Sequence, residues 1–317
     1  MRHRVVPMVR RVALFGGTGF VGSYLVDALL ENGYEPSLLV RAGSEHKVRQ
    51  PVRCRVVSGD VCSDAAIDDT LEGCDAVIYC IGILREFPKA GITFEALQYE
   101  AVVRIARAAK SKHIERFLLM SANGVKLPGT AYQETKFRAE RHLQDNGFAV
   151  TVFRPSVIFG DPRGAMEIAT QIYRDMVAQP FPAIGFFTGW RPGRGEVAMS
   201  PVHVEDVAFA FVHALENPST VGATYALGGG DVLSWTEMIR RVARTVNRAK
   251  WIIPMPITLM RLVATLLDWL LIFPVTRDQL TMLAEGNTAD PDELRAVIER
   301  PPQSFVPENL AYLQDRS

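Results

Sequence analysis

The stretch from Val12 to Gly22, which reads Val-Ala-Leu-Phe-Gly-Gly-Thr-Gly-Phe-Val-Gly, constrains the fold more than any other part of the chain. An apolar run of four residues ends in glycines at G-x-x-G-x-x-G spacing, and a helical pattern follows. Gly16 permits a tight turn, Gly19 lets the backbone approach a phosphate, and Gly22 lets the helix pack close to the strand. The free amides and the dipole of that helix form an anion site. The stretch predicts a dinucleotide site rather than an empty structural turn, with contacts from Gly16, Thr18, Gly19, Phe20, Val21 and Gly22.

The order of apolar runs and helical patterns predicts an α/β fold built on a doubly wound parallel sheet. After the first strand, further strands are expected at residues 37–40, 55–57, 76–81, 116–120 and 150–153, with helical segments between them. We expect a nucleotide-binding domain over 11–230, interrupted near 160–200 by a Pro-, Gly- and aromatic-rich insertion on the substrate side. A smaller, mostly helical lobe is expected over 231–317.

Composition excludes several classes of function. Lys plus Arg and Asp plus Glu both number 35, and this zero net charge argues against a general nucleic-acid binder. The basic leader lacks an apolar core and is not expected to be a secretory signal. The four cysteines show no metal-ligand spacing, so no metal is expected; buried free thiols in a reducing cytoplasm are the expectation for Cys54, Cys62, Cys74 and Cys80.

The end of the second strand indicates which nucleotide binds. Sites for NAD usually carry an acid here that accepts a hydrogen bond from the ribose 2′-hydroxyl, whereas an arginine suits the 2′-phosphate of NADP. This chain places Arg41 there, with no acid before Glu45. Arg41 can form charge-assisted bonds to the phosphate, so NADP(H) is favoured over NAD(H). The alternative is a solvent-facing arginine at a strand end.

Ser121 and the pair Tyr132 and Lys136 form the second chemical pattern. Thr130-x-x-Gln133 is a capping box, which places Tyr132 and Lys136 on one face of the same helix. A nearby ammonium lowers the pKa of a phenol, by roughly three units at about 4 Å before desolvation is counted. Tyr132 can then exchange a proton with a substrate oxygen that Ser121, at the end of a strand, holds in place. Taken alone, the Y-x-x-x-K spacing also occurs on ordinary surface helices.

Read together, these patterns resemble the short-chain dehydrogenase/reductase superfamily, in its extended or atypical branch. Within it, the chain is similar to the group around the nucleotide-binding accessory subunit of respiratory complex I. The resemblance covers about Val12 to Gly229. The motifs that carry it, in the order found in that family, are the glycine-rich stretch, Gly59-Asp60-Val61, Ser121, Tyr132 with Lys136, Arg154-Pro155-Ser156-Val157-Ile158-Phe159-Gly160 and Val202-His203-Val204-Glu205-Asp206-Val207-Ala208.

The resemblance implies further nucleotide contacts. Asp60 and Val61 would flank the adenine, Ile81 and Gly82 the ribose, and Pro155, Ser156 and Val157 the nicotinamide amide, while Lys136 would also orient the ribose. Two departures argue against epimerase or dehydratase chemistry on a nucleotide sugar. Only ten residues separate Ser121 from Tyr132, and Gln98 or a neighbour stands where such members carry an asparagine.

Two functions follow from the sequence. The first is an NADP(H)-dependent oxidoreductase that acts on an apolar carbonyl, alcohol or quinone-like small molecule, with Tyr132 as acid/base. The second is a non-catalytic, NADPH-bound accessory or assembly protein like the complex I subunit. A cytoplasmic location is expected, with peripheral membrane contact or a membrane-complex partner as a possibility raised by residues 240–275. There, a basic helix face precedes an apolar stripe that Trp251 and Trp269 bracket; ordinary core is the alternative.

Overall fold

The computed structural model describes residues 9–188, 195–259 and 277–316, and they divide into two compact units. The first unit consists of the residues up to 154 together with 205–225. The second joins residues 155–204 to the chain from 226 onward. Each unit is therefore assembled from segments that are distant in the sequence.

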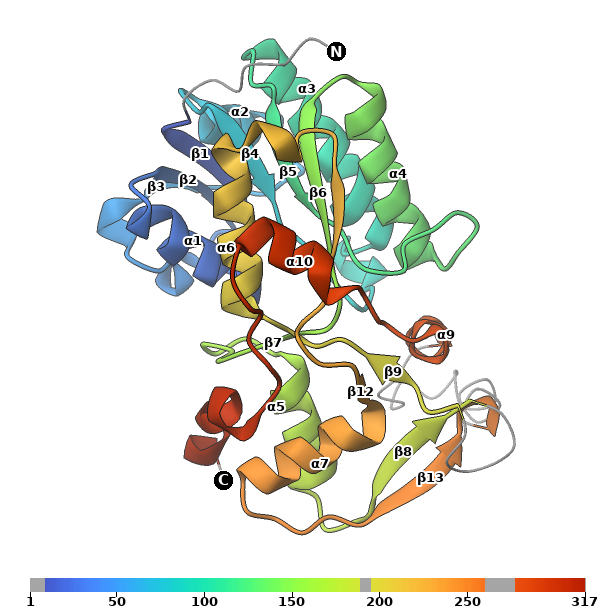
Figure 1. The fold of residues 1–317 in the computed structure, drawn as a ribbon. Helices are drawn as coiled ribbons and strands as arrows, with labels where there is room; N and C mark the ends of the chain where they lie inside the picture. The colour runs from blue at the N-terminus through green and yellow to red at the C-terminus, as the bar shows by residue number, and fades with distance from the viewer. Residues whose placement is uncertain (1–8, 189–194, 260–276, 317) are drawn as a thin grey trace. The chain divides into compact units, whose positions relative to one another are not determined.

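The first unit is built on a seven-stranded sheet (Figure 1) with the order β11-β6-β5-β4-β1-β2-β3. The five pairings from β3 to β6 are all parallel. The order reverses direction between β1 and β4, which confirms the predicted doubly wound sheet. The strands are β1 (Arg11–Phe15), β2 (Glu35–Val40), β3 (Arg55–Ser58), β4 (Ala76–Tyr79), β5 (Arg116–Met120), β6 (Ala149–Pro155) and β11 (Thr224–Leu227).

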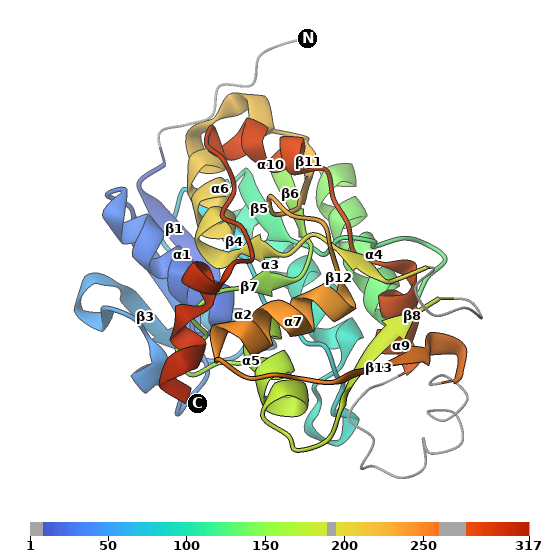
Figure 2. The same ribbon diagram turned by 60° about the horizontal axis from the view of Figure 1, so that its bottom comes forward.

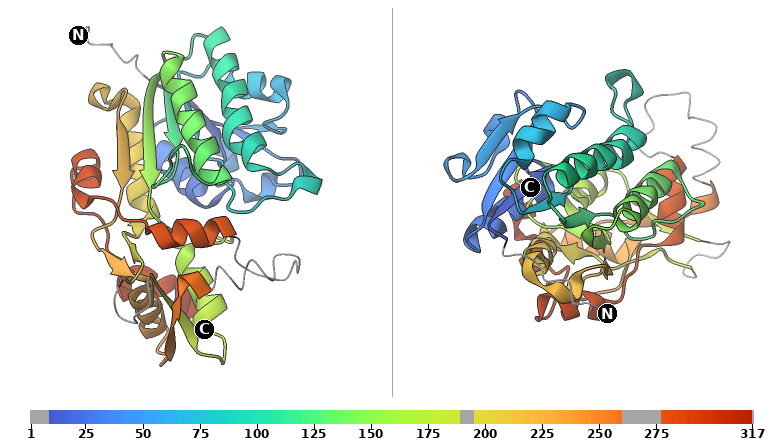
Figure 3. Two further views of the ribbon diagram at one scale, coloured as in Figure 1. Left: turned by 90° about the vertical axis from the view of Figure 1, so that its right-hand side faces the viewer. Right: turned by 90° about the horizontal axis from the view of Figure 1, so that it is seen from above.

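Helices cover both faces of this sheet. Helices α1 and α6 lie on one face, and α3 and α4 lie on the other (Figures 1 and 3). Central strand residues such as Phe15, Val77 and Phe117 are fully buried, which explains why these strands read as continuous apolar runs. The helices are α1 (Phe20–Glu31), α2 (Asp64–Leu71), α3 (Ala101–Ser111), α4 (Ala131–Asp145) and α6 (Val204–Glu216).

The helical segment between β4 and β5 begins with a wider turn. Residues Glu95–Glu100 form a π-helix that continues directly into α3. Such turns insert an extra residue into the helical repeat and often lie at functional sites. Here the π-turn carries the buried side chain of Gln98.

A buried arginine connects the sheet to α6. Arg116 at the start of β5 is 1% exposed and donates hydrogen bonds to the carbonyl oxygens of Ala149 and Leu215. It also donates to the hydroxyls of Thr151 and Thr220. Burial lowers the pKa of its guanidinium to about 10. Because Leu215 lies in the last turn of α6, Arg116 satisfies a carbonyl that a helix end leaves without an intrahelical partner.

The described residues of the second unit form three two-stranded sheets and several short helices, and Figure 2 shows α7 beside β8 and β13. The side chain of Ser234 caps α7 and that of Asp290 caps α10. Phe159, Ile239 and Phe305 are central to its apolar core. The elements are β7 (Ile158–Phe159), α5 (Ile168–Ile172), a π-helix (Tyr173–Val177), β8 (Ala183–Phe187), β9 (Ala198–Met199), β10 (Val202–His203), β12 (Leu233–Ser234), α7 (Trp235–Thr245), β13 (Ile252–Pro256), α9 (Arg277–Glu285), α10 (Pro291–Ile298) and a 3-10 helix (Pro307–Arg316).

Within the described ranges, no helix is both long enough and apolar enough to cross a membrane. The apolar stripe predicted beyond Leu259, with Trp269, lies outside the described residues. All four cysteines are free. Cys74 and Cys80 are buried, as expected, and burial raises their pKa values to about 11 and about 12. The expectation of burial is wrong for Cys62, which is exposed in the turn after β3, and Cys54 is half-buried.

Candidate functional site

The glycine-rich turn joins β1 to α1 where the order of the sheet reverses. Gly16 has φ +103°, and a Cβ there would lie 2.9 Å from the sulfur of Cys80 and 3.1 Å from the amide nitrogen of Ile81. A Cβ on Gly22 would lie 2.0 Å from the carbonyl oxygen of Gly16. These two glycines allow the turn to press against both β4 and α1. The structure thus gives a steric reason for the two outer glycines of the pattern.

Gly19 has a different role. A Cβ there would meet only the carbonyl oxygen of Gly16, at 3.3 Å, and the residue is exposed. Gly19 is the N-cap of α1, so no side chain caps the helix, and the first turn contains no acidic residue. The amides of the first turn, from Phe20 to Gly22, therefore have no capping side chain at this helix end. Together with the helix dipole they fit a bound pyrophosphate.

The ends of β2 and β3 hold the predicted adenosine contacts. Arg41 follows β2 directly and is exposed. An acid also occupies this corner, because Glu45 accepts a hydrogen bond from the Ser58 hydroxyl at 3.1 Å. One carboxylate oxygen of Asp60 accepts the amide of Cys62 at 2.9 Å and shapes the turn after β3, where Val61 is buried. Both a cation and an anion therefore lie near the ribose end of the predicted site.

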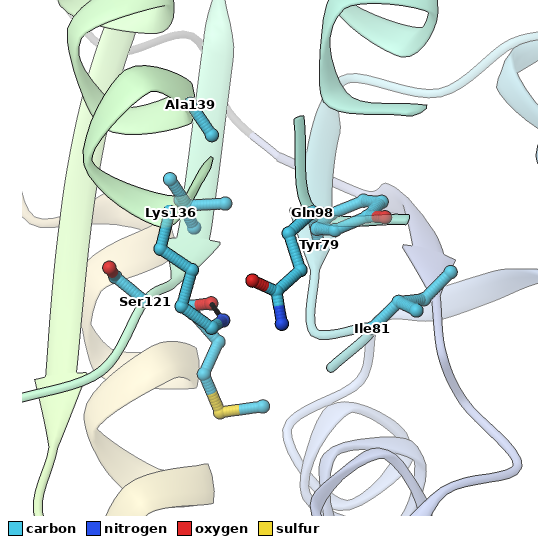
Figure 4. A pocket seen from close by; sticks show the side chains of 8 residues that line it. Tyr79, Ile81, Gln98, Ser121, Lys136 and Ala139 are labelled. Atoms are coloured by element: carbon cyan, nitrogen blue, oxygen red, sulfur yellow. Dashed lines mark hydrogen bonds between the residues drawn. The ribbon is translucent and has the colours of Figure 1, made fainter. Parts of the chain in front are cut away.

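A narrow pocket, too tight to hold a water molecule as it stands, lies beyond the ends of β4 and β5 (Figure 4). Ser121 and Lys136 lie on one side of it, and the amide of Gln98 points toward them from the other. The Nζ atom of Lys136 donates to the carbonyl oxygen of Met120 at 3.2 Å. It also lies 4.0 Å from where a Cβ on Gly82 would stand. The structure thus brings together four residues that the sequence predicts for the site: Ile81, Gly82, Ser121 and Lys136.

Lys136 and Ser121 are both buried polar groups. Lys136 is 6% exposed, and burial lowers its pKa to about 8, although the charge of Glu140 partly opposes this. Ser121 is 4% exposed, and its hydroxyl has no hydrogen-bond partner among the described residues. A buried hydroxyl without a hydrogen-bond partner destabilises the folded protein by about 1–3 kcal/mol, so its presence calls for an explanation. A ligand oxygen that accepts a hydrogen bond from Ser121 would explain it.

Tyr132 lies in the first turn of α4, which the predicted capping box of Thr130 and Gln133 starts. Its ring meets Phe94 edge-on, with 5.6 Å between ring centroids. The Nζ atom of Lys136 is 5.6 Å from the centroid of the Tyr132 ring. Burial raises the pKa of the Tyr132 phenol, whereas the sequence argument expected the Lys136 ammonium to lower it. Desolvation dominates here, and Tyr132 is not among the residues that line the pocket.

Gln98 and Thr135 support this pocket, and neither was among the predicted site residues. The Thr135 hydroxyl donates to Gln98 Oε1 at 2.9 Å, and Gln98 Nε2 donates to the carbonyl oxygen of Ile83 at 3.1 Å. Gln98 therefore links the loop after β4 to the helix that carries Lys136. The only sequence signal came from the resemblance, in which Gln98 or a neighbour stands where sugar-modifying members carry an asparagine. The π-turn that contains Gln98 leaves no sequence pattern.

The three residues predicted for the nicotinamide amide belong to the second unit. The Ser156 hydroxyl donates to the carbonyl oxygen of Asn287 at 2.6 Å, and the Ser156 amide donates to Leu227 at 2.9 Å. The carbonyl oxygen of Val157 accepts the amide of Val202 at 3.0 Å. These bonds hold the segment that begins at Pro155 within its own unit. The contact of Pro155, Ser156 and Val157 with a nucleotide stays a prediction. Metal ligation has no candidate, since the described residues contain no suitable cluster of His, Cys, Asp and Glu.

Known proteins resemble this chain in sequence and in fold. Ceramide reductase of Caulobacter vibrioides is 26% identical over 250 residues, which cover 77% of this chain and 73% of that protein. The mitochondrial NADH dehydrogenase [ubiquinone] 1 alpha subcomplex subunit 9 of Arabidopsis thaliana is 26% identical over 296 residues, covering 89% and 70%. UDP-glucose 4-epimerase of Thermus thermophilus, solved with NAD, has the same fold, with a TM-score of 0.73 at 19% identity over 97% of this chain and 99% of that one.

The match to a protein family covers more than half of the chain. Residues 16–179 match the NAD(P)H-binding family, from the first glycine of the turn to a point beyond β6 and α5. The matched region contains the uncapped helix end and the pocket of Ser121 and Lys136. The chain therefore belongs to the NAD(P)H-binding family, within the short-chain dehydrogenase/reductase and epimerase-like proteins that the sequence predicted.

Proposed function

We propose that this protein is an NADP(H)-dependent oxidoreductase that reduces an apolar carbonyl or quinone-like small molecule. The observation that carries the proposal is the Ser121 hydroxyl, buried and unpaired in the described chain, in the same pocket as Lys136. An unpaired donor beside a buried amine is an arrangement suited to holding a substrate oxygen. The reductase among the relatives supports the reaction class.

Ser121 and Tyr132 have separate roles in the proposed reaction. NADPH, when bound, supplies the hydride that the carbonyl carbon receives. The Ser121 hydroxyl donates a hydrogen bond to the substrate oxygen, and the Tyr132 phenol gives that oxygen its proton before solvent reprotonates the phenolate. Burial raises the pKa of the Tyr132 phenol, so the phenol is protonated at neutral pH and can act as the proton donor. Lys136 orients the ribose of the nucleotide beside Gly82.

We propose the remaining nucleotide contacts in the same terms. Arg41 binds the 2′-phosphate and so favours NADP(H) over NAD(H). Asp60 and Val61 flank the adenine, and Ile81 and Gly82 flank the ribose. Residues 155–157 bind the nicotinamide amide. What supports these roles is that Arg41 and Asp60 follow the ends of β2 and β3, on the side of the sheet where doubly wound folds bind ligands.

The substrate is proposed to be apolar. Ile81, Leu119 and Met120 contribute apolar side chains to the pocket, and ionisable groups are few there. The Caulobacter relative is named as a reductase of ceramide, which agrees with a substrate of low polarity. We place the protein in the cytoplasm, peripheral at the inner face of the membrane or on a membrane-bound complex.

A second candidate function is a non-catalytic protein that holds NADPH as a structural group. Two observations favour it. Tyr132 does not line the pocket that Ser121 and Lys136 share. In addition, four of the relatives are named as subunits of NADH dehydrogenase or NADH-ubiquinone oxidoreductase. In this function the nucleotide would stabilise the fold, and a membrane complex would be the partner.

One experiment separates the two candidates. The nucleotide is released from the purified full chain and identified, and the protein is then loaded with NADPH and mixed with a panel of ketones and quinones. Oxidation of bound NADPH by at least one apolar carbonyl, slowed in Ser121→Ala, supports the oxidoreductase. Slow nucleotide exchange with no oxidation across the panel supports the accessory protein.

A further inference from the structure

The second unit carries an open groove of about 670 Å³ where strands β8 and β13 begin. Its lining comes from residues 177–182 and 248–251, which are about 70 positions apart in the sequence. Two aromatic side chains stand out from it: Phe181 is 72% exposed and Trp251 is 83% exposed. Further along β13, Ile253 is 50% exposed and lies on the same face of the strand as Trp251.

Hydrogen bonds fix the backbone around the groove, so the exposure of Phe181 and Trp251 is determined by the fold. The amide of Ala183 donates to the carbonyl oxygen of Trp251 at 2.8 Å, which fixes the two segments side by side. Lys250 donates to the carbonyl oxygens of Val177 and Gln179. Prolines at 180 and 182 restrict the backbone on both sides of Phe181. Phe181 and Trp251 therefore stay outside the core.

The charge at the groove is positive. Arg248 donates to the carbonyl oxygen of Ala178 at 3.3 Å, and Lys250 also bonds to carbonyl groups, so neither cation is neutralised by an acid among the described residues. None of the ten lining residues is acidic.

The arginines that the sequence placed on the same basic face behave differently. Arg240 and Arg244 lie 3.8 and 3.5 Å from Glu237, and Arg241 lies 3.0 Å from Asp231. Glu237 is shared by Arg240, Arg244 and, at 3.5 Å, Arg241, so the arginines of α7 are partly compensated, whereas Arg248 and Lys250 have no acidic partner among the described residues. The groove brings together residues from two predicted segments. Arg248 and Lys250 come from the predicted basic segment, and Phe181 comes from the predicted insertion near 160–200.

We propose that this groove binds the surface of an anionic phospholipid bilayer. Trp251 and Phe181 enter the interfacial region, where aromatic rings are favoured, and Arg248 and Lys250 face the headgroup phosphates. Exposed aromatics beside uncompensated cations fit such a surface better than they fit a neutral partner. The inference rests on the peripheral placement proposed above and is independent of whether the nucleotide turns over.

Vesicle sedimentation with the full chain tests the proposal. Wild type should bind vesicles of phosphatidylcholine mixed with phosphatidylglycerol, more weakly at high salt, and should bind pure phosphatidylcholine poorly. The double variant Phe181→Ala with Trp251→Ala should bind the anionic vesicles at least about tenfold more weakly, because it loses two large apolar side chains. Arg248→Gln should bind about fivefold more weakly.

The matched control is Phe87→Ala, which removes an aromatic side chain that is 54% exposed in the first unit. It should bind vesicles like wild type. Circular dichroism and NADPH titration, expected to be unchanged in every variant, check that the variants fold. Equal vesicle binding by wild type and the double variant would overturn the groove as the membrane surface, while leaving the peripheral placement intact.

Absence of wild-type binding to either vesicle would overturn the groove and the peripheral placement together, and NADPH titration would still report on the nucleotide site. Light scattering without lipid tests the remaining alternative, in which a second copy of this chain occupies the groove. If wild type self-associates and the double variant does not, the groove binds a second copy of this chain and the proposal is wrong.

Discussion

The ammonium of Lys136 donates a hydrogen bond to the carbonyl oxygen of Met120, 3.2 Å away, and so ties helix α4 to the end of strand β5. Met120 directly precedes Ser121, whose amide donates to the carbonyl oxygen of Phe153 at 2.7 Å. The position of the Lys136 amine relative to the Ser121 hydroxyl is therefore set by backbone bonds. These two polar groups are therefore held in place relative to each other before a ligand binds.

Lys136 should give the wild-type protein a pH-dependent stability. Its pKa falls from 10.5 to about 8 because burial disfavours the charged form. Between these values the unfolded chain binds a proton that the folded chain does not, so the free energy of unfolding should rise with pH. Relative to Lys136→Met, wild type should gain about 3 kcal/mol across this window. Denaturant unfolding of both proteins measures it, and a difference that stays constant with pH would contradict the burial of the amine.

Substitutions of Ser121 and Thr135 should have different effects on the free energy of unfolding. Ser121→Ala removes a buried hydroxyl that has no partner in the described chain, so the free energy of unfolding should not fall and should rise by up to about 1–3 kcal/mol. Thr135→Val, the matched control, deprives Gln98 of its donor and should cost about 1–3 kcal/mol. Ser121→Ala should still slow turnover about a hundredfold if it holds the substrate oxygen. Equal destabilisation by both variants in urea would show that the Ser121 hydroxyl is structural.

Two glycines of the turn should separate folding from nucleotide binding. In Gly19→Ala the new Cβ meets only one carbonyl oxygen, at 3.3 Å, and the backbone conformation suits alanine. This variant should fold with a loss of about 1 kcal/mol and bind NADPH at least tenfold more weakly, because the methyl group stands over the uncapped amides. Gly22→Ala should instead unfold at a lower temperature, since its Cβ would lie 2.0 Å from Gly16. Calorimetry with and without NADPH measures both, and unchanged NADPH affinity in Gly19→Ala would exclude the turn as the phosphate site.

Arg41 should decide the choice of nucleotide. Arg41→Ala removes a charge-assisted bond and should weaken NADPH binding about tenfold or more, with NADH nearly unaffected. Glu45→Gln is the companion variant, because the Glu45 carboxylate lies beside Ser58 in the same corner and would repel a 2′-phosphate. It should tighten NADPH binding. Fluorescence titrations with both nucleotides test this, and equal losses for NADPH and NADH in Arg41→Ala would remove Arg41 from that role.

The sequence predicted the parallel sheet and the glycine turn because local chemistry determines both. Continuous apolar strands can only be buried on both faces, and the glycines at 16 and 22 are required by contacts of their own turn. The capping box at Thr130 likewise appears as predicted, since its two hydrogen bonds span three residues. Such features depend on neighbours in the chain and can be read from it.

Other features depend on residues that are distant in the sequence. Arg116 reads as an ordinary charged residue before a strand, yet it is buried because carbonyl groups about 100 positions away accept its hydrogen bonds. The pKa of Tyr132 depends on how deeply the folded chain buries it, which the spacing from Lys136 does not reveal. The groove of Phe181 and Trp251 exists only because β8 and β13 pair. No sequence period signals these contacts.

The most direct test of the proposed reaction is deuterium transfer. The full chain is incubated with NADPH deuterated at C4 of the dihydronicotinamide and with the carbonyl compound that oxidises it fastest. Mass spectrometry of the product should find the deuterium on the former carbonyl carbon, and Ser121→Ala should form the same product about a hundredfold more slowly. Deuterated NADPH that remains bound and unoxidised with every carbonyl and quinone, in wild type as in Ser121→Ala, would contradict hydride transfer and leave the nucleotide as a structural group.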